Sequence, residues 1–234
     1  MKISIVIPTY NEKKNIERLL QRINQTLTQS QLQATIVIVD DNSPDGTASY
    51  AKKLNKKYPN MLVYNRTMDR GLATAILYGI KHSKSDVIIG MDADLNHPPE
   101  LIPKLIVNLK KADIVIASRF IKGGGMEDRV RYWGTLIFNL FLKHILDFPV
   151  MDNLSGYYAI KRSTLLSLPS SQIYQGYGEY HLRLVYRAQQ QGSKLKEIPV
   201  FYQKRQYGES KSSLFRLFFK YLFNALKLRL FNWD

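Results

Sequence analysis

Two aspartates separated by one residue offer the clearest chemistry in this sequence. Asp92 and Asp94 follow Val87–Gly90, a short apolar run typical of a buried strand. In an extended segment, side chains two residues apart point to the same side, so both carboxylates face one spot beyond the strand. Two acids at one spot repel each other unless a cation lies between them, and a hard divalent ion such as Mg²⁺ or Mn²⁺ prefers oxygen ligands. Asn96 continues the alternation and offers a third oxygen.

An isolated Asp-x-Asp pair is also typical of a solvated turn, so the other acids of the chain matter. Glu12, Asp40 and Asp41 also follow predicted strands. The carboxyl ends of parallel strands meet at one edge of a sheet, where ligands bind. A nucleotide site with a bound cation accounts for these acids together. For Asp40 we favour a structural role, capping a helix or pairing with lysine, but not for Asp41.

Strand and helix patterns alternate along the chain, and these elements would position the acids. Short apolar runs predict strands at 2–8, 35–39, 61–64, 87–90 and 113–118. Helical apolar spacing lies between them, with Asn11 as the expected cap of the first helix and Pro98 and Pro99 at the start of a later one. The alternation predicts an α/β fold with a mostly parallel sheet and helices on both faces.

Composition and charge narrow the class of protein. The chain has 234 residues, no cysteine and a formal net charge of +15. It is long enough for one domain with a small appendage, and no apolar run reaches the ~18–20 residues that span a bilayer. We expect a cytoplasmic protein bound peripherally to the inner membrane face. The positive charge suits phosphate-bearing substrates or anionic lipid, and no nucleic-acid-binding motif accompanies it.

Six motifs in order resemble one enzyme family. They are PTYNE (8–12), VDDNSPDGT (39–47), GLATAILYG (71–79), MDADLNHPPE (91–100), ASR (117–119) and RQYGESK (205–211). Together they resemble the inverting family-2 glycosyltransferases, and more narrowly the dolichol-phosphate (polyprenol-phosphate) mannose synthases. The resemblance implies a GT-A fold over about 1–212, a nucleotide-sugar donor (GDP-mannose above all), a Mg²⁺ or Mn²⁺ ion, and a polyprenyl or dolichyl phosphate acceptor.

The resemblance also implies roles for donor-side residues. The nucleotide base and ribose would be bound by Pro8, Tyr10, Glu12, Val39 and Asp41. The diphosphate would be bound by Asp92, Ala93, Asp94 and Asn96, with Asp92, Asp94 and Asn96 holding the metal. Arg119 would reach the sugar or the phosphates. Arg205 and Lys211 would close over the diphosphate.

A helix at about 130–147 would bind the acceptor. Arg131, Thr135 and Asn139 match a family pattern at four-residue spacing, which keeps them on one side of a helix. The surrounding apolar residues suit either a prenyl chain at the headgroup level or an ordinary core helix. A phosphate acceptor is already anionic at neutral pH, so it needs a cation such as Arg131 rather than a base. Asp92, Asp94 and Arg131 are therefore the expected catalytic residues.

The segment 213–234 is predicted to be a basic amphipathic helix at the membrane surface. Arg216, Lys220, Asn224 and Lys227 form one polar stripe among large apolar residues. The alternative is a terminal helix buried against the domain or in a dimer. The sequence leaves the oligomeric state open.

Departures from the family pattern lie on the sugar and acceptor side. The acid of the Asp-x-Gly region is displaced to Asp152, and Arg183 stands where relatives usually have glutamate, with Glu179 one turn earlier. Neither Asp152 nor Glu179 is assigned as a base. The alternatives are a UDP-sugar polyprenyl-phosphate glycosyltransferase, or a basic membrane- or RNA-binding protein with a degenerate nucleotide site.

Overall fold

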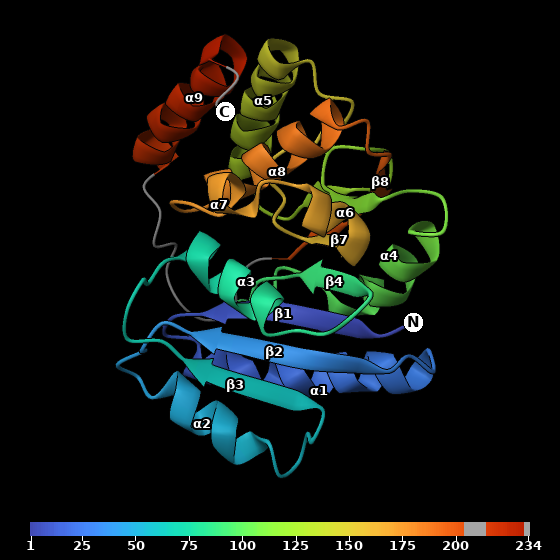
Figure 1. The fold of residues 1–234 in the computed structure, drawn as a ribbon, viewed down its shortest axis with the longest axis vertical. Coiled ribbons are helices and arrows are strands. Elements are labelled where there is room, and N and C mark those ends of the chain that lie inside the picture. Colours follow the sequence, from blue (N-terminus) through green and yellow to red (C-terminus); the bar gives the residue numbers. More distant parts are fainter. Residues whose placement is uncertain (204–213, 232–234) are drawn as a thin grey trace.

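A seven-stranded sheet runs through the middle of the molecule (Figure 1). The computed structural model describes residues 1–203 and 214–231. The strands are β1 Ile3–Thr9, β2 Ala34–Asp40, β3 Met61–Asn65, β4 Val87–Gly90, β5 Ile114–Ser118, β7 Tyr158–Lys161 and β8 Leu195–Pro199. They lie in the order β3-β2-β1-β4-β7-β5-β8, and β7 runs antiparallel to both of its neighbours. The expected mostly parallel sheet is confirmed.

Helices cover both faces of this sheet, as the sequence predicts (Figure 1). They are α1 Lys13–Gln29, α2 Thr47–Leu54, α3 Leu72–Lys81, α4 Ile102–Asn108, α5 Arg129–Leu146, α6 Arg162–Ser167, α7 Ser170–Ile173, α8 Glu179–Gln190 and α9 Leu214–Phe231. A 3₁₀ turn over Pro99–Leu101 precedes α4, which places Pro99 at its first position. The short strands β6 (Gly125–Met126) and β9 (Phe201–Tyr202) pair with each other beside the main sheet.

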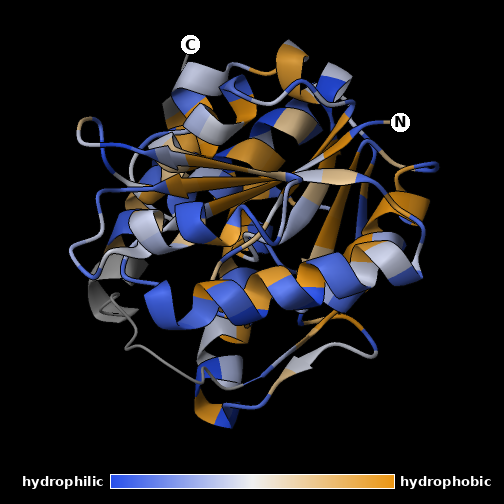
Figure 2. Ribbon diagram, turned by 90° about the horizontal axis from the view of Figure 1, so that it is seen from below, coloured by the Kyte–Doolittle hydropathy of each residue, from blue (hydrophilic) through white to orange (hydrophobic). Residues whose placement is uncertain are grey.

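Alternation along the strands divides the interior into two cores. Ile5 and its neighbours on one face pack with α1 and α4, whereas Val6 and Val39 on the other face pack with α3. Figure 2 shows the apolar strands between helices whose colouring is mixed. Helix α3 lies close to β1, because a Cβ added at Gly79 would stand 2.5 Å from the Val6 side chain. Burial of each such aliphatic side chain contributes about 1.5–3 kcal/mol, so the sheet provides a rigid base for the loops at its edge.

The expected capping of α1 by Asn11 is wrong. Asn11 has φ 59°, in the left-handed region that asparagine tolerates, and Glu12 is the residue that precedes the helix. The reason is a tight turn that joins two loops: the Asn11 backbone N–H donates to Ser43 Oγ at 2.9 Å, and the Glu12 N–H donates to Thr47 Oγ1 at 3.0 Å. The first and second acid-bearing loops are thereby held together.

One face of helix α9 packs against the domain, as the alternative of a buried terminal helix predicts. Tyr221, Ala225 and Leu228 are buried and pack toward α5 and α8. On the opposite side, large apolar residues are exposed, and a similar exposed row lies on α5. These two rows, here called the apolar surface, are Val130, Trp133, Ile137, Leu140 and Phe141 of α5 with Phe219, Phe223, Leu226 and Leu230 of α9. Among the described residues, no helix has the length and apolar character needed to cross a membrane.

Candidate active site

A cavity of about 400 Å³ opens at the carboxyl ends of β1, β2 and β4. Its lining comprises Pro8, Thr9, Tyr10, Glu12, Asp41, Arg70, Gly71, Leu72, Asp92, Ala93, Asp94 and Tyr177. Seven residues expected to bind the donor are thus brought together, and they come from segments far apart in the sequence. The edge location follows from the parallel strands, because the three acid-bearing loops leave the sheet on the same side.

Asp92 and Asp94 reach the cavity from a turn rather than from an extended strand. Strand β4 ends at Gly90, and Leu95 adopts φ 67°. Asp94 is nearly buried and accepts hydrogen bonds from the Asn96 backbone N–H at 3.1 Å and from its side-chain Nδ2 at 3.0 Å. Asn96 does not line the cavity, so the structure does not place it as a third metal ligand beside the acids. Its amide orients the carboxylate of Asp94 instead.

A buried histidine fixes the other carboxylate-bearing residue, and sequence reasoning missed it. The Asp92 backbone N–H donates to His97 Nδ1 at 2.8 Å, and the His97 ring stacks on Tyr157 with centroids 4.8 Å apart. Burial lowers the pKa of His97 to about 4, although the nearby charge of Asp94 opposes this shift. His97 is therefore neutral at pH 7. Its position three residues after the Asp-x-Asp motif was the signal that could have drawn attention to it.

Asp41 is held in the cavity wall by an arginine that was also missed. Arg66 lies just beyond the end of β3, and its Nε donates to Asp41 Oδ1 at 2.8 Å. A second guanidinium nitrogen binds the same oxygen, and the Gly71 N–H donates to Oδ2 at 2.7 Å. Both side chains are buried, so this pair is strongly oriented. A cation after β3, at the sheet edge that carries the acids, was the available signal.

Asp40 has structural contacts, but among the described residues its partners are a threonine and a loop serine rather than a helix N-terminus or a lysine. Asp40 is fully buried and accepts hydrogen bonds from Thr9 Oγ1 at 2.8 Å and from the Ser43 N–H at 2.8 Å. These bonds join β1 to the loop after β2. They leave Asp41, not Asp40, facing the cavity.

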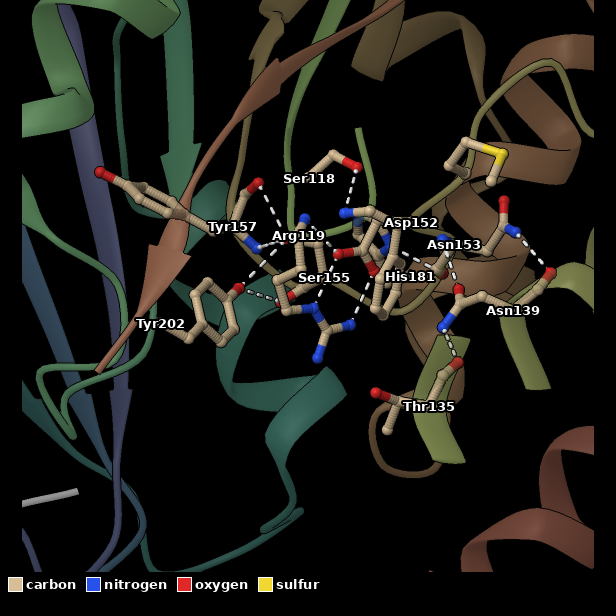
Figure 3. A network of polar contacts seen from close by, with 12 residues as sticks. Ser118, Arg119, Thr135, Asn139, Asp152, Asn153, Ser155, Tyr157, His181 and Tyr202 are labelled. Carbon is tan, nitrogen blue, oxygen red and sulfur yellow. Dashed lines mark hydrogen bonds and ion pairs between the residues drawn. The ribbon is translucent and has the colours of Figure 1, made fainter. Parts of the chain in front are cut away.

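Arg119 does not line the cavity but forms a buried ion pair with Asp152 (Figure 3). Asp152 accepts hydrogen bonds from Arg119 Nε at 2.7 Å, from Nη2 at 2.7 Å and from its backbone N–H at 3.0 Å. Burial would lower the pKa of Arg119, but the charge and hydrogen bonds of Asp152 outweigh burial and raise it. Asp152 has no exposed surface. It is therefore an anchor for Arg119 and is not placed to act as a base.

Of the expected acceptor residues on α5, Asn139 is turned inward and Thr135 bonds back to its own helix (Figure 3). Thr135 Oγ1 donates to the Arg131 carbonyl at 2.7 Å, and Asn139 Nδ2 donates to the Thr135 carbonyl at 2.8 Å. Asn139 is fully buried and accepts from the Asn153 N–H at 2.8 Å. This chain of bonds ties α5 to the loop that carries Asp152. Arg131 lies half-buried in the first turn of α5 and does not line the donor cavity.

The remaining residues expected at the donor site are Val39, Arg205 and Lys211. Val39 is fully buried in the core beneath α3, because its side chain alternates to the face away from the cavity. Its side chain does not line the cavity, and the expected contact of Val39 with the nucleotide stays a prediction. Arg205 and Lys211 lie outside the described residues.

The donor atoms at the cavity fit a hard divalent cation. Within residues 1–203 and 214–231, no group of three or more His, Cys, Asp or Glu side chains is arranged to enclose a metal ion. Asp92 and Asp94 nevertheless present carboxylates at one cavity, and the Asp92 side chain is 42% exposed. One or two carboxylates completed by substrate phosphates is the coordination that Mg²⁺ commonly takes.

Comparison with solved structures shows the fold. Glucosyl-3-phosphoglycerate synthase from Mycobacterium tuberculosis, solved with Mn²⁺, uridine diphosphate and phosphoglyceric acid, matches with a TM-score of 0.72 over 97% of this chain and 78% of that chain, at 19% identity. A structure of the same enzyme with Mg²⁺ and uridine diphosphate matches with a TM-score of 0.70. The GT-A architecture expected from the motifs is confirmed by these likenesses.

Comparison with curated proteins shows the family. The chain is 36% identical over its whole length to a dolichol-phosphate mannosyltransferase of Pyrococcus furiosus, of which it spans 65%. It is 32% identical to an undecaprenyl-phosphate mannosyltransferase of Micrococcus luteus, over 91% of this chain and 88% of that protein. A polyprenol monophosphomannose synthase of Mycolicibacterium smegmatis matches at 32% identity over 89% of this chain and 80% of that protein. Residues 4–167 match the model of glycosyl transferase family 2. The chain therefore belongs to glycosyl transferase family 2.

Proposed function

We propose that this protein transfers a hexose, mannose by preference, from a nucleoside diphosphate sugar to the phosphate of a polyprenyl lipid. The observation that carries the proposal is that Tyr10, Asp41, Asp92 and Asp94 line the same cavity. Three relatives are named for mannosyl transfer to polyprenyl phosphates, which favours mannose and, with it, GDP-mannose as the donor.

The cavity offers different chemistry at its two ends. Tyr10, an exposed aromatic, and Asp41, an oriented carboxylate, suit a nucleobase that stacks and donates hydrogen bonds. Asp92 and Asp94 would hold Mg²⁺ or Mn²⁺ with the diphosphate. The ion supplies charge stabilisation for the leaving diphosphate when bound. Asn96 and His97 hold these two acids in place through the hydrogen bonds described above.

The acceptor side needs a cation and no base. A phosphate monoester has a second pKa near ~6, so its oxygen is anionic at neutral pH and can attack the anomeric carbon directly. That oxygen forms the new bond as the bond to the diphosphate breaks on the opposite face, which inverts the configuration. Arg131 would position the acceptor phosphate by charge-assisted hydrogen bonds. Asp152 is committed to Arg119 and takes no proton in this scheme.

The lipid would approach along the apolar surface of α5 and α9. Large exposed apolar residues on two neighbouring helices are suited to the headgroup and upper acyl region of a bilayer. Lys227 lies beside this row on α9, over the ring of Phe223, and suits anionic headgroups. We therefore propose a peripheral protein on the inner membrane face, whose Arg131 meets a phosphate held at the membrane surface.

A panel of donors tests the proposal. Thermal unfolding would be followed with GDP, GDP-mannose, UDP and UDP-glucose, each with Mn²⁺ and with EDTA. A selective ligand raises the melting temperature. We expect GDP-mannose with Mn²⁺ to give the largest shift, and polyprenyl phosphate to be mannosylated. Selective stabilisation by UDP-glucose would favour glucosyl transfer, and no shift with any donor would contradict the proposal.

A further inference from the structure

We propose that Glu179 binds the transferred sugar: one of its carboxylate oxygens accepts a hydrogen bond from a sugar hydroxyl, and α9 completes this subsite. The inference rests on the proposed function, because it adds a sugar contact to the same donor site. It also gives a role to a glutamate that departs from the family pattern and that neither the metal nor the diphosphate uses.

The carboxylate of Glu179 is buried and half-satisfied. Glu179 is the first residue of α8 and is only 2% exposed. Its Oε1 lies 3.2 Å from Lys220 Nζ of α9, whereas its Oε2 has no hydrogen-bond partner in the described part of the chain. A buried carboxylate oxygen without a donor destabilises the fold unless a ligand supplies the missing bond. A hydroxyl-bearing ligand is therefore the group that this oxygen lacks.

The position of Glu179 places this oxygen behind the wall of the donor cavity. Tyr177, two residues earlier, lines the cavity with Asp92 and Asp94. The loop before α8 lies directly on the carboxylate, because a Cβ added at Gly176 would stand 2.2 Å from Glu179 Oε1. The same loop also approaches Gly71, which lines the cavity. A Cβ added at Gly71 would lie 3.7 Å from the Gly176 carbonyl oxygen. A short movement of this loop would open the carboxylate to the cavity.

Helix α9 contributes a second polar group at the same place. A Cβ added at Gly178 would stand 2.2 Å from the Tyr221 hydroxyl, so this hydroxyl also lies against the loop. Burial raises the pKa of Tyr221, and the negative charges of Glu179, Tyr177 and Asp92 raise it further. The Tyr221 hydroxyl and the Glu179 carboxylate thus lie against neighbouring glycines of the same loop. Glu179, Tyr221 and Lys220 would together form the polar lining of the sugar subsite behind Tyr177.

The chemistry suits a sugar rather than a phosphate. A carboxylate accepts hydrogen bonds and repels anions, while a hexose hydroxyl is a neutral donor. Lys220 supplies a counter-charge to the buried acid through Oε1 and leaves Oε2 available. Buried polar groups of this kind reject an analogue that lacks the matching hydroxyl, because they are then left unpaired. Glu179 would therefore contribute to the choice of sugar.

The test compares ligands with and without the sugar. Calorimetry with Mn²⁺ would measure GDP and GDP-mannose binding to the wild type, to Glu179→Gln and to the control Glu100→Gln, whose ion pair with Arg22 lies outside the cavity. We expect Glu179→Gln to weaken GDP-mannose by about 10- to 100-fold and to leave GDP binding unchanged. Glu179→Asp, which keeps the charge but withdraws the oxygens, should show the same selective loss.

Deoxy analogues of the sugar identify the contact. One deoxymannose donor should bind more weakly to the wild type, and Glu179→Gln should remove the difference between that analogue and GDP-mannose. Equal losses of GDP and GDP-mannose in both variants would overturn the inference and make Glu179 a structural residue. If the wild type binds neither GDP nor UDP, the proposed function itself fails, which is a distinguishable result.

Discussion

The acids of the cavity act through partners that fix their orientation. Asp94 is gripped by the amide of Asn96, and Asp92 is tied to His97 through its backbone. Asp41 is fixed by Arg66 and Gly71. Such preorganisation means that a donor meets carboxylates that are already aligned, which reduces the entropy lost on binding.

Asp94→Asn is expected to abolish metal-dependent donor binding and to leave the fold intact. The variant keeps the shape of the side chain but removes one of the four carboxylates that line the cavity, which are Glu12, Asp41, Asp92 and Asp94. Donor affinity with Mn²⁺ should fall at least about tenfold, and the melting temperature without metal should stay equal or rise because repulsion is relieved. Calorimetry and thermal unfolding measure both, with Asp113→Asn as the control for charge. Turnover that persists in EDTA would refute this prediction.

His97 is expected to make stability depend on pH. Its folded pKa of about 4 lies below the ordinary value of 6.5 because the ring is buried. Between pH 6.5 and about pH 4, His97 therefore binds a proton in the unfolded chain but not in the folded protein. This contribution is fully present above pH 6.5 and is lost progressively as the pH falls toward 4, by up to about 3 kcal/mol.

Urea unfolding between pH 4.5 and pH 7.5 would measure this effect, at roughly half-unit steps. His97→Gln should flatten the pH dependence of the unfolding free energy, whatever its effect on stability at pH 7. His181, also buried with a lowered pKa, provides the comparison through His181→Gln. A wild type and a His97→Gln variant with parallel pH profiles would show that His97 is not responsible.

Removing one partner of the buried Arg119–Asp152 pair is expected to lower the free energy of unfolding strongly. Asp152→Asn leaves a buried guanidinium without its counter-charge, which destabilises by about 3–5 kcal/mol. Asp113→Asn breaks a more exposed pair with Lys161 and should cost only about 0–1 kcal/mol. Urea unfolding would compare them. Similar losses in the two variants would show that Asp152 does not anchor Arg119 as its contacts suggest.

Single residues were predictable where spacing decides their neighbours. The Asp92 and Asp94 pair is recognisable from a strand followed by alternating acids, and both do line the cavity. Arg66 and His97 were missed because their partners come from loop geometry, which the sequence does not encode by spacing. The motif that contains Val39 gives its place along the chain but not the face of β2 on which its side chain packs.

At the scale of elements, α5 and α9 form a pair with one buried side and one apolar exposed side. Asn139 ties α5 inward, and Lys220 and Asn224 tie α9 to α8 through Glu179 and Arg183. Polar contacts of α9 thus face the domain at the very positions that the sequence assigned to lipid. Large apolar side chains occupy the exposed side of both helices, which is the side that we propose for membrane contact.

Polar substitution on the apolar surface is expected to weaken membrane binding without unfolding the protein. Trp133→Ser and Phe223→Ser each remove an exposed aromatic, so each should cost about 1–2 kcal/mol of binding to vesicles. Vesicle flotation measures the effect, and Met68→Ser, an exposed apolar residue away from α5 and α9, is the control. If a variant that carries both Trp133→Ser and Phe223→Ser binds vesicles as the wild type does, the membrane contact lies elsewhere.

The elements themselves were mostly predictable because their periodic patterns are strong. The strand over Val87–Gly90 has the predicted bounds, and α1 and α3 occur where apolar spacing placed them. Strand β7 was missed because it is only four residues long, and so short a run indicates neither a strand nor its antiparallel direction. The start of α1 was misjudged because a left-handed turn at Asn11 serves contacts with the next loop.

At the scale of the whole molecule, donor and acceptor chemistry would come from different parts of the fold. The donor cavity belongs to the loops after β1, β2 and β4, whereas Arg131 belongs to α5, beside the apolar surface. The loop that carries Asp152 and Asn153 connects the two, since it binds Arg119 after β5 and Asn139 of α5 (Figure 3). Under the proposed function, a soluble nucleotide and a membrane-bound phosphate would reach the protein at these two different places.

This division predicts that Arg131→Ala affects one substrate and not the other. Use of polyprenyl phosphate should weaken by about 1.5–3 kcal/mol through the loss of charge-assisted hydrogen bonds, while donor affinity stays unchanged. Arg131→Lys should rescue activity only in part, because an ammonium keeps the charge but lacks the planar fork. Arg129→Ala, two residues away and exposed on the same helix, is the matched control and should change neither. Calorimetry with the donor and initial rates over a range of polyprenyl phosphate separate the two effects. If Arg131→Ala reduces donor affinity as much as acceptor use, Arg131 acts on the diphosphate, and the two substrates share one cationic site rather than two.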